Sequence, residues 1–382
     1  MFRSDKIHSN AVRFLGLAMI VVGLICAASQ FARGATAPAQ VAAAEMPRVE
    51  NAQIETRAVP VNPESALREI AAKADKPLWL GYGVDQIAGE HDACCSDYND
   101  QGRCGTCRLE RDHNESVGTR RTDGTVKLEA PRQLVVLFRF EAGKVSKIRV
   151  ASQDCTLDAG GLPFIWLTAV KPAESVALLA GYVRTAEFEG HGERSPGNGA
   201  LMAIALHADA SADRAFESFV KPDQPQGLRK QAAFWMGAAR GKTGFAGLQQ
   251  MAKSDPSSDV RAHVAFALSV SHEAGAVEEI IRMVHDDPST HVRGQALFWL
   301  AQKAGKKALG AITGAIENDP DTDVKKKAVF ALSQLPKDEG VPKLIEVAQT
   351  NRNPEVRKQA MFWLGQSNDP RAQQFFEKVL SQ

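Results

Sequence analysis

Five of the six cysteines lie between residues 94 and 155, and their spacing suits three kinds of chemistry. Cys104 and Cys107 form the C-x-x-C motif of "CGTC", Cys94 and Cys95 are adjacent, and Cys155 follows later. A C-x-x-C pair can be a redox-active dithiol, part of a zinc site, or part of a disulfide framework. The surrounding sequence is needed to choose among these.

The context of the C-x-x-C motif argues against redox and haem chemistry. A thioredoxin-like site places the motif where a strand meets a helix. Here the polar segment "SDYNDQGR" precedes it, which is typical of a loop. Haem attachment requires His directly after the motif, and Arg108 occupies that position.

Zinc and disulfide bonds are the remaining interpretations of the cysteines. Four thiolates, with His91 as a further donor, could complete a tetrahedral site, but a single C-x-x-C without a matched second pair is a weak zinc signal. We therefore expect no cofactor, with zinc as the less favoured alternative. The expected disulfide framework draws on an odd number of candidates, which leaves one thiol free or paired between molecules: Cys94, Cys95, Cys104, Cys107 and Cys155.

The N-terminus predicts export, which agrees with disulfide formation. Three basic residues precede the apolar run Phe14–Ala28, and "GATA" supplies a small-residue cleavage pattern. We expect a signal peptide over residues 1–37, with an uncleaved single-pass anchor as the alternative. Either places the protein in the bacterial periplasm or envelope, with membrane contact only through an uncleaved segment. The Ala- and Pro-rich residues 38–63 are predicted to form a flexible linker.

Residues 64–166 are predicted to form a small α+β domain that carries the cysteines. Its first part, "ESALREIAAKA", has a helical pattern. Two apolar, alternating stretches flank Ala142-Gly143 in "QLVVLFRFEAGKVSKIRVAS", which is the signature of a β-hairpin.

The rest of the chain repeats itself. Phe-Trp recurs in "KQAAFWMGA", "GQALFWLAQ" and "KQAMFWLGQ" at intervals of 64 residues, and "HVAFALS" and "KAVFALS" fall at the midpoints, so the period is 32. Asp-Pro precedes the motif in several units, where one helix must stop before the next begins. Each unit is therefore predicted to be a pair of antiparallel helices that buries its apolar face only by stacking on its neighbours.

The pattern D-P-x-x-x-V-[RK]-x-x-[AV]-x-x-x-[LM] resembles the short HEAT-like repeats found in phycobilin lyase subunits. The resemblance covers about residues 196–382 and implies an all-α solenoid over residues 167–382, which follows the small α+β domain. Nothing else in the chain supports bilin chemistry. Deoxyhypusine hydroxylases also use such repeats and bind iron through repeated His-Glu pairs, but this chain has one such pair, His272-Glu273. It therefore lacks that metal site.

Helical geometry separates two kinds of aromatic residue in the motif. At 100° per residue, Trp363 falls on the same stripe as Val356, Ala360 and Leu364. We therefore expect Trp235, Trp299 and Trp363 in the core, alternating with Ala267 and Ala331. The motif Arg residues are expected to bond Asp residues of the neighbouring repeat, namely Asp255, Asp287 and Asp319, as the related repeats do.

The Phe residues of the motif lie off that stripe, where the related repeats are usually polar. In HEAT-like solenoids this helix generally lines the concave face, and a row of Phe with Gln beside it resembles the Trp/Asn ladders by which armadillo repeats hold extended peptides. The alternative is that each Phe packs sideways against the adjoining helix. The candidate protein-binding residues are Phe234, Phe266, Phe298, Phe330, Phe362, Gln295, Gln302, Gln359 and Gln366.

The formal charge of +1, from 46 basic and 45 acidic residues, indicates no nucleic-acid partner. The favoured function is therefore a non-enzymatic envelope scaffold or adaptor that binds protein or extended peptide on the solenoid, with no catalytic or metal residues. The alternative is a thiol-redox or zinc-dependent activity centred on the C-x-x-C motif.

Overall fold

The computed structural model describes residues 45–59, 61–89, 106–110, 132–188 and 195–381. The chain divides into Met1–Ala42 and Ala43–Gln382, and all described residues belong to the second part. The predicted signal or anchor segment and three of the five cysteines, Cys94, Cys95 and Cys104, lie outside these ranges. No helix within the ranges combines the length and apolar character needed to cross a membrane.

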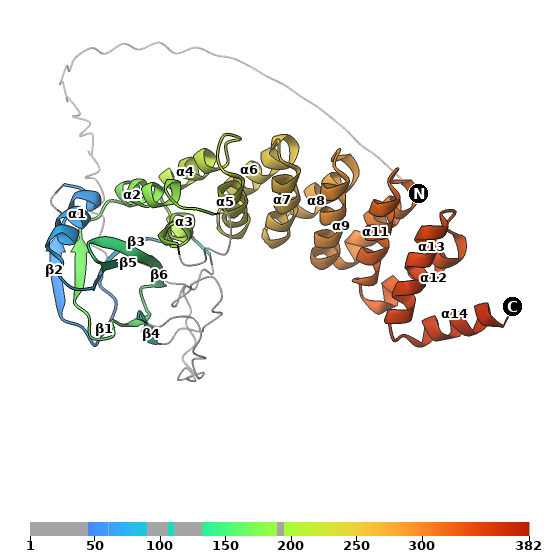
Figure 1. Cartoon of the computed structure of the whole chain (residues 1–382), viewed down its shortest axis with the longest axis horizontal. Helices are drawn as coiled ribbons and strands as arrows, with labels where there is room; N and C mark the ends of the chain where they lie inside the picture. The colour runs from blue at the N-terminus through green and yellow to red at the C-terminus, as the bar shows by residue number, and fades with distance from the viewer. Residues whose placement is uncertain (1–44, 60, 90–105, 111–131, 189–194, 382) are drawn as a thin grey trace, which may run out of the picture. The chain divides into compact units, whose positions relative to one another are not determined.

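Two sheets form the N-terminal part of the described chain (Figure 1). The larger has the order β2-β8-β3-β5-β6, and the smaller has the order β1-β7-β4. Strand β3 pairs antiparallel with β5, and β5 with β6, while β2 and β3 both pair parallel with β8. The strands are β1 (Val49–Glu50), β2 (Ile54–Ala58), β3 (Leu78–Asp85), β4 (Thr106–Arg108), β5 (Gln133–Glu141), β6 (Lys144–Ser152), β7 (Thr156–Asp158) and β8 (Phe164–Thr168).

The predicted hairpin is present, but one expectation about its surroundings is wrong. Ala142 and Gly143 have φ of 50° and 72° and join β5 to β6 in a two-residue turn. The sheet around the hairpin is mixed, because β8 runs parallel to β2 and β3. Strands β1 and β2 lie inside the predicted linker of residues 38–63, so this linker is wrong over those strands. Their pairing partners are over 100 residues away, which local composition does not reveal.

Alternating side chains of the larger sheet enter two separate cores. Leu80, Val136 and Phe138 belong to a core that also contains helix residues. On the opposite face, Trp79 and Leu137 pack with apolar residues of the smaller sheet and with Cys107 and Cys155. Both faces are therefore covered, which explains why β5 is apolar at nearly every position.

Helices cover the first of these faces and connect it to the repeats. Asn62 caps α1 by accepting the N–H of Ser65 at 2.8 Å. Helix α3 approaches β6 so closely that a Cβ at Gly199 would lie 2.0 Å from the carbonyl oxygen of Ile148. The helices of this region are α1 (Pro63–Lys73), α2 (Pro172–Arg184), α3 (Pro196–Leu206) and α4 (Ser211–Phe219).

The C-terminal part consists of stacked helix pairs with one continuous apolar core, as the 32-residue period predicts. One helix ends directly before Asp255-Pro256, Asp287-Pro288 and Asp319-Pro320, and the next begins after each. The helices are α5 (Gln226–Ala239), α6 (Gly241–Ser254), α7 (Ser258–Val270), α8 (Ala276–Asp286), α9 (Thr290–Ala304), the 3-10 turn η1 (Gly305–Lys307), α10 (Ala308–Asn318), α11 (Thr322–Ser333), α12 (Lys337–Thr350), α13 (Pro354–Gln366) and α14 (Pro370–Leu380).

Candidate protein-binding surface

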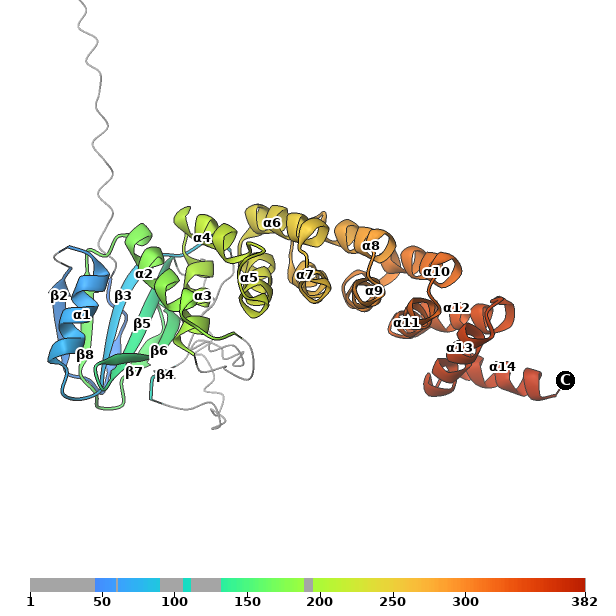
Figure 2. The same ribbon diagram turned by 45° about the horizontal axis from the view of Figure 1, so that its top comes forward.

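The repeated aromatic motif lies on one row of helices, α5, α7, α9, α11 and α13, which we call the motif row. Figure 2 shows α6, α8 and α10 in a second row beside it. Neighbours in the motif row pack more closely than neighbours in the second row. At the α5/α7 contact, a Cβ on Gly237 would lie 2.1 Å from the carbonyl oxygen of Ala267. This spacing brings equivalent side chains of successive repeats into contact.

The aromatic side chains of the motif row touch in an unbroken series, which we call the aromatic ribbon. Each ring contact joins side chains on the same helix or on neighbouring helices of the row, so the series runs from α5 to α13. Its members are Phe234, Trp235, Phe266, Phe298, Trp299, Phe330, Phe362 and Trp363.

The ribbon explains why Phe-Trp alternates with Phe-Ala. Phe266 stacks on Phe234 with ring centroids 5.7 Å apart, and its other neighbour is Trp299 at 4.6 Å. Phe330 likewise lies between Phe298 at 6.1 Å and Trp363 at 4.9 Å. Each Phe of a Phe-Ala repeat is therefore held between rings from the repeats on both sides, at distances typical of favourable aromatic pairs.

The exposure of these rings corrects one expectation and refines another. The three Trp residues are half-buried and pack at the edge of the core, so the expectation that they lie inside it is wrong. Their indoles extend beyond the core stripe to meet Phe rings. Four of the Phe residues are also half-buried, whereas Phe362 is 53% exposed. The sideways packing considered as the alternative is thus present, and it still leaves part of each ring at the surface.

The four candidate glutamines lie on the same helices. Gln295 and Gln359 are half-buried, and Gln302 and Gln366 are exposed. Within the described part of the chain, none of these four side chains has a hydrogen-bond partner. Each amide therefore keeps both its donor and its acceptor groups for another molecule.

Two further polar atoms, one in the ribbon and one beside it, are buried without a partner among the described residues: Nε1 of Trp363 and Nε2 of His263. The His263 ring packs edge-on against Phe266, with centroids 5.3 Å apart. Burial, helped by the charge of Lys230, lowers the pKa of His263 to about 4, so the ring is neutral at pH 7. Sequence reasoning missed this residue because no other repeat has His there: His263 stands at the position that Gln295 and Gln359 occupy in their repeats.

A second periodic feature, the ladder of Arg–Asp pairs, confirms the predicted partners. Arg229 contacts both carboxylate oxygens of Asp255 at 2.9 and 3.1 Å. Arg261 and Asp287 repeat this geometry at 2.8 and 3.0 Å, as do Arg293 and Asp319. Each guanidinium also donates to carbonyls of the preceding loop, and each Asp accepts the N–H two residues further on. The ladder joins successive repeats and leaves no group of these pairs for a ligand.

The two described cysteines are structural in character. Cys107 lies on β4 and Cys155 lies just before β7, with exposures of 3% and 1%. Both are disulfide-bonded. The wider framework, and the use of Cys94, Cys95 and Cys104, stays a prediction. The described residues contain no group of three or more His, Cys, Asp or Glu side chains arranged to hold a metal ion.

A buried polar chain near the first repeat was not predicted. Tyr82 Oη lies 2.8 Å from Ser175 Oγ, which lies 2.9 Å from His207 Nε2, and His207 Nδ1 lies 2.6 Å from the carbonyl oxygen of Ala203. Burial lowers the pKa of His207 to about 4. No sequence spacing links residues from three distant elements, so only the fold could reveal this chain. All three side chains are fully buried, which makes the chain structural rather than catalytic.

Comparison with known proteins supports the repeat architecture. The family described as HEAT repeats matches residues 277–361 and 309–382. The solenoid of this chain is thus built of HEAT repeats, preceded by a small region with strands. No curated protein matches the chain.

Solved structures also align, at low similarity. Human deoxyhypusine hydroxylase with glycerol is 14% identical, with a TM-score of 0.29, over 54% of this chain and 90% of that chain. A Kap121p mutant is 14% identical, with a TM-score of 0.34, over 51% of this chain and 25% of that one. The CpcE–CpcF complex of phycocyanin lyase from Nostoc sp. PCC7120 is 18% identical, with a TM-score of 0.27, over 54% of this chain and 80% of that chain.

Proposed function

We propose that this protein is an exported, non-enzymatic scaffold that binds an extended segment of another protein along the aromatic ribbon. The carrying observation is the unbroken series of ring contacts from α5 to α13, whose members are half-buried or exposed. A solenoid needs only its core stripe to fold.

The ribbon supplies the two kinds of contact that an extended peptide needs. Partly exposed rings, fixed by their neighbours, can bury apolar side chains with little loss of conformational entropy. Gln302 and Gln366, exposed and unbonded within the described chain, can pair with a peptide backbone. A contiguous aromatic surface of this kind also favours a partner, because uncovered it promotes aggregation.

Export to the bacterial envelope is part of the proposal and rests on the N-terminal sequence. Three basic residues, the apolar run Phe14–Ala28 and the small-residue pattern after it support a signal peptide or, alternatively, an anchor. The two buried disulfide-bonded cysteines suit an oxidising compartment.

The test is affinity capture from a native envelope extract with the unchanged chain and with the double variant Phe298→Ser, Phe330→Ser. We expect the unchanged chain to retain a partner that the variant loses. Because these rings also contact their neighbours, a second variant, Gln302→Ala with Gln366→Ala, removes exposed groups only. It should weaken capture without lowering the melting temperature.

The matched control is Val379→Ser with Leu380→Ser, since these residues are 42% and 85% exposed apolar side chains outside the ribbon. This control should capture the partner normally. Equal capture by correctly folded ribbon variants would refute the ribbon as the binding surface. Cys107 is buried and disulfide-bonded, so nothing in the described residues favours the redox or zinc alternative over binding.

A further inference from the structure

One repeat interface departs from the Arg–Asp ladder at both of its positions. Lys325 stands where the three earlier repeats have Arg, and Asn351 stands where they have Asp. The Lys325 ammonium turns to the backbone carbonyl of Glu317, at 2.8 Å. In the described chain, no ladder ion pair therefore joins α11 to the loop before α13. The helices around this interface, α10, α11, α12 and α13, are all formed.

The residue after the ladder Asp changes as well. Pro follows Asp at the three earlier interfaces, whereas Arg352 follows Asn351. At each earlier interface the three positions are Arg, Asp and Pro, with charges of +1, −1 and 0 that sum to zero. Here they are Lys, Asn and Arg, which sum to +2. The net charge thus rises by two at the place where the structural pair is lost, because one negative charge is lost and one positive charge is gained.

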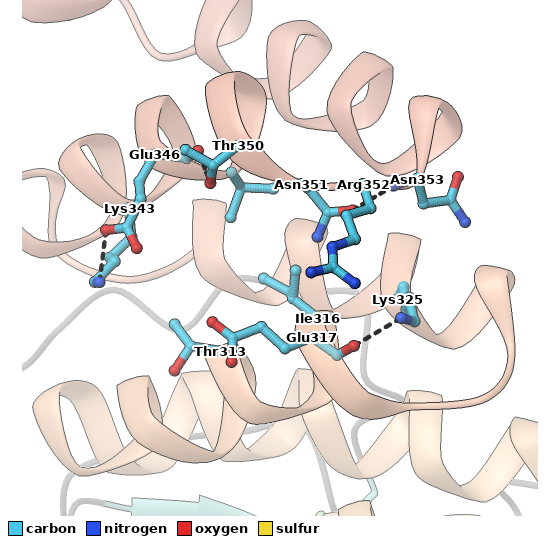
Figure 3. Close-up of a pocket in the computed structure, with 11 residues that line it drawn as sticks. Thr313, Ile316, Glu317, Lys325, Lys343, Glu346, Thr350, Asn351, Arg352 and Asn353 are labelled. Carbon is cyan, nitrogen blue, oxygen red and sulfur yellow. Dashed lines mark hydrogen bonds and ion pairs between the residues drawn. The ribbon is translucent and has the colours of Figure 1, made fainter.

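A pocket of about 400 Å³ opens at this interface, between α10, α12 and the loop before α13 (Figure 3). Ile316 and Val347 supply apolar surface, and Lys325 and Arg352 supply two of the cations that line the pocket. The volume suits one or two side chains of a ligand.

The loop that carries Arg352 is fixed by its own hydrogen bonds. Arg357 donates to the carbonyl oxygens of Asn351 and Arg352 at 2.8 and 3.1 Å, and Asn351 Oδ1 accepts the N–H of Asn353 at 3.0 Å. The guanidinium of Arg352 itself forms no hydrogen bond or ion pair with any described residue. The chain thus positions a cation and leaves its donors unused.

Acidic groups also line the pocket and limit what it can bind. Glu346 is paired with Lys343 at 2.6 Å, so this pair is internally neutral. Glu317 has no side-chain partner in the described residues and would repel a second negative charge. With Lys325, Lys343 and Arg352 against these two carboxylates, the pocket has a net charge of +1. This balance favours a ligand that brings one negative charge.

We propose that the pocket binds a single acidic side chain, Asp or Glu, of the protein segment that the solenoid recognises; this rests on the proposed binding function. Arg352 would hold the carboxylate through paired N–H donors, and the remaining donors of Lys325 would add a second cation. The ligand's carboxylate thereby takes the role that Asp255, Asp287 and Asp319 have at the other interfaces. The pocket would set register and specificity along the array.

The experiment titrates the isotope-labelled full chain with the acetylated pentapeptide Ala-Ala-Glu-Ala-Ala and follows the Arg352 side-chain Nε–H signal by NMR. The matched probes are Ala-Ala-Gln-Ala-Ala and inorganic phosphate. We expect the Glu peptide to bind at least fivefold more tightly than either probe, and Arg352→Ala to weaken it by a similar factor.

Two further variants separate the pocket from the fold. Lys325→Arg with Asn351→Asp rebuilds the ladder pair, so it should abolish Glu-peptide binding while the melting temperature stays the same or rises. Lys242→Ala removes an exposed lysine of α6 and should change nothing. The assignment is wrong if the rebuilt pair binds the peptide normally, if the Gln peptide or phosphate binds equally well, or if Lys242→Ala weakens binding as much as Arg352→Ala.

Capture of the native partner separates this inference from the proposed function. Loss of capture in the ribbon variants but not in Arg352→Ala, together with no Glu-peptide binding, would leave the scaffold function standing and refute the pocket. Selective Glu-peptide binding with normal capture by the ribbon variants would support the pocket and refute the ribbon.

Discussion

The Arg–Asp ladder and the aromatic ribbon share the same helices and the same period, yet they differ in exposure. In the Arg229–Asp255 pair the side chains are 4% and 2% exposed, and all three guanidinium nitrogens donate hydrogen bonds within the chain. Rings of the ribbon remain partly at the surface, and the glutamines beside them are unbonded in the described part of the chain. Regular repetition alone therefore does not distinguish residues that hold repeats together from residues that bind a partner. The two classes are distinguished by whether the polar groups are hydrogen-bonded, and the apolar surface buried, within the chain.

This contrast predicts that ladder substitutions mainly lower stability, whereas ribbon substitutions mainly lower binding. Removing one member of a buried ion pair leaves an uncompensated charge. Removing part of a half-exposed ring loses a smaller apolar contact. The expected effects therefore fall in a definite order, and a reversal of that order would break the comparison.

The largest effect is expected at the middle of the ladder. Arg293→Ala leaves the buried carboxylate of Asp319 without its guanidinium partner. It also removes the N–H donors that the carbonyl oxygens of Asp287 and Pro288 accept. We expect the free energy of unfolding to fall by about 3–5 kcal/mol, measured by chemical denaturation. The control is Lys343→Ala, which breaks the more exposed pair with Glu346 and should cost under about 1 kcal/mol. Similar losses in the two variants would show that the ladder is not the stronger element.

The second largest effect is expected from acid, which should lower the free energy of unfolding through the buried polar chain of Tyr82, Ser175 and His207. Burial lowers the pKa of His207 to about 4, below the ordinary value of 6.5 expected when the chain is unfolded. The unfolded state therefore binds a proton first as the pH falls, so stability is complete above about pH 6.5 and declines towards pH 4.

The decline due to His207 should reach about 3 kcal/mol between pH 7 and pH 4, at about 1.4 kcal/mol per pH unit. Denaturation curves over this range measure it. His207→Gln should be less stable at pH 7 and show a shallower pH slope, because the remaining slope includes His263, whose pKa is lowered in the same direction. An unchanged slope in His207→Gln would contradict the assignment.

The two halves of the fold were predictable to different degrees. In the repeats, apolar residues recur at the positions of Val260, Val264 and Leu268, which helical geometry assigns to the core, and Asp-Pro marks the loops. Local sequence therefore determines these elements. The sheet depends on pairing between distant segments: β2 meets β8 at Ile54 and Phe164. Ile54 is exposed and lies among polar residues, so nothing local indicated a strand.

The candidate site was also predicted only in part. Spacing identified the Phe row and the ladder pairs, but a helical projection assigned the indoles to the core, because it considers each helix alone. Contacts such as that of Phe266 with Trp299 join residues 33 positions apart on neighbouring helices of the motif row, and they follow from how closely these helices pack. The pocket at Lys325 and Asn351 was missed. These two residues stand out only once the structure shows that the equivalent Arg and Asp residues of the earlier repeats form ion pairs.

Within the ribbon, Trp299 should have an intermediate effect on stability. Its indole contacts Phe266 and Phe298 at 4.6 and 4.8 Å but is only half-buried. Trp299→Ala is expected to cost about 2 kcal/mol, less than a fully buried Trp, and Trp299→Phe under about 1 kcal/mol. A double-mutant cycle with Phe266→Ala should give a coupling of about 0.5–1.5 kcal/mol. No coupling would mean that the ribbon is not a connected structure.

The smallest effect on stability is expected at Phe362, where the comparison is sharpest. This ring is 53% exposed, and among the described residues its one ring contact is with Trp363, at a centroid distance of 5.0 Å. Phe362→Ser should therefore change the free energy of unfolding by under about 1 kcal/mol, whereas Phe330→Ser, between Phe298 and Trp363, should cost about 2 kcal/mol. Partner capture should fall in both variants, because both rings belong to the proposed surface. Reduced capture by Phe362→Ser at nearly unchanged stability would show that the ring itself contributes to binding. Normal capture by Phe362→Ser would confine binding to the ribbon before α13.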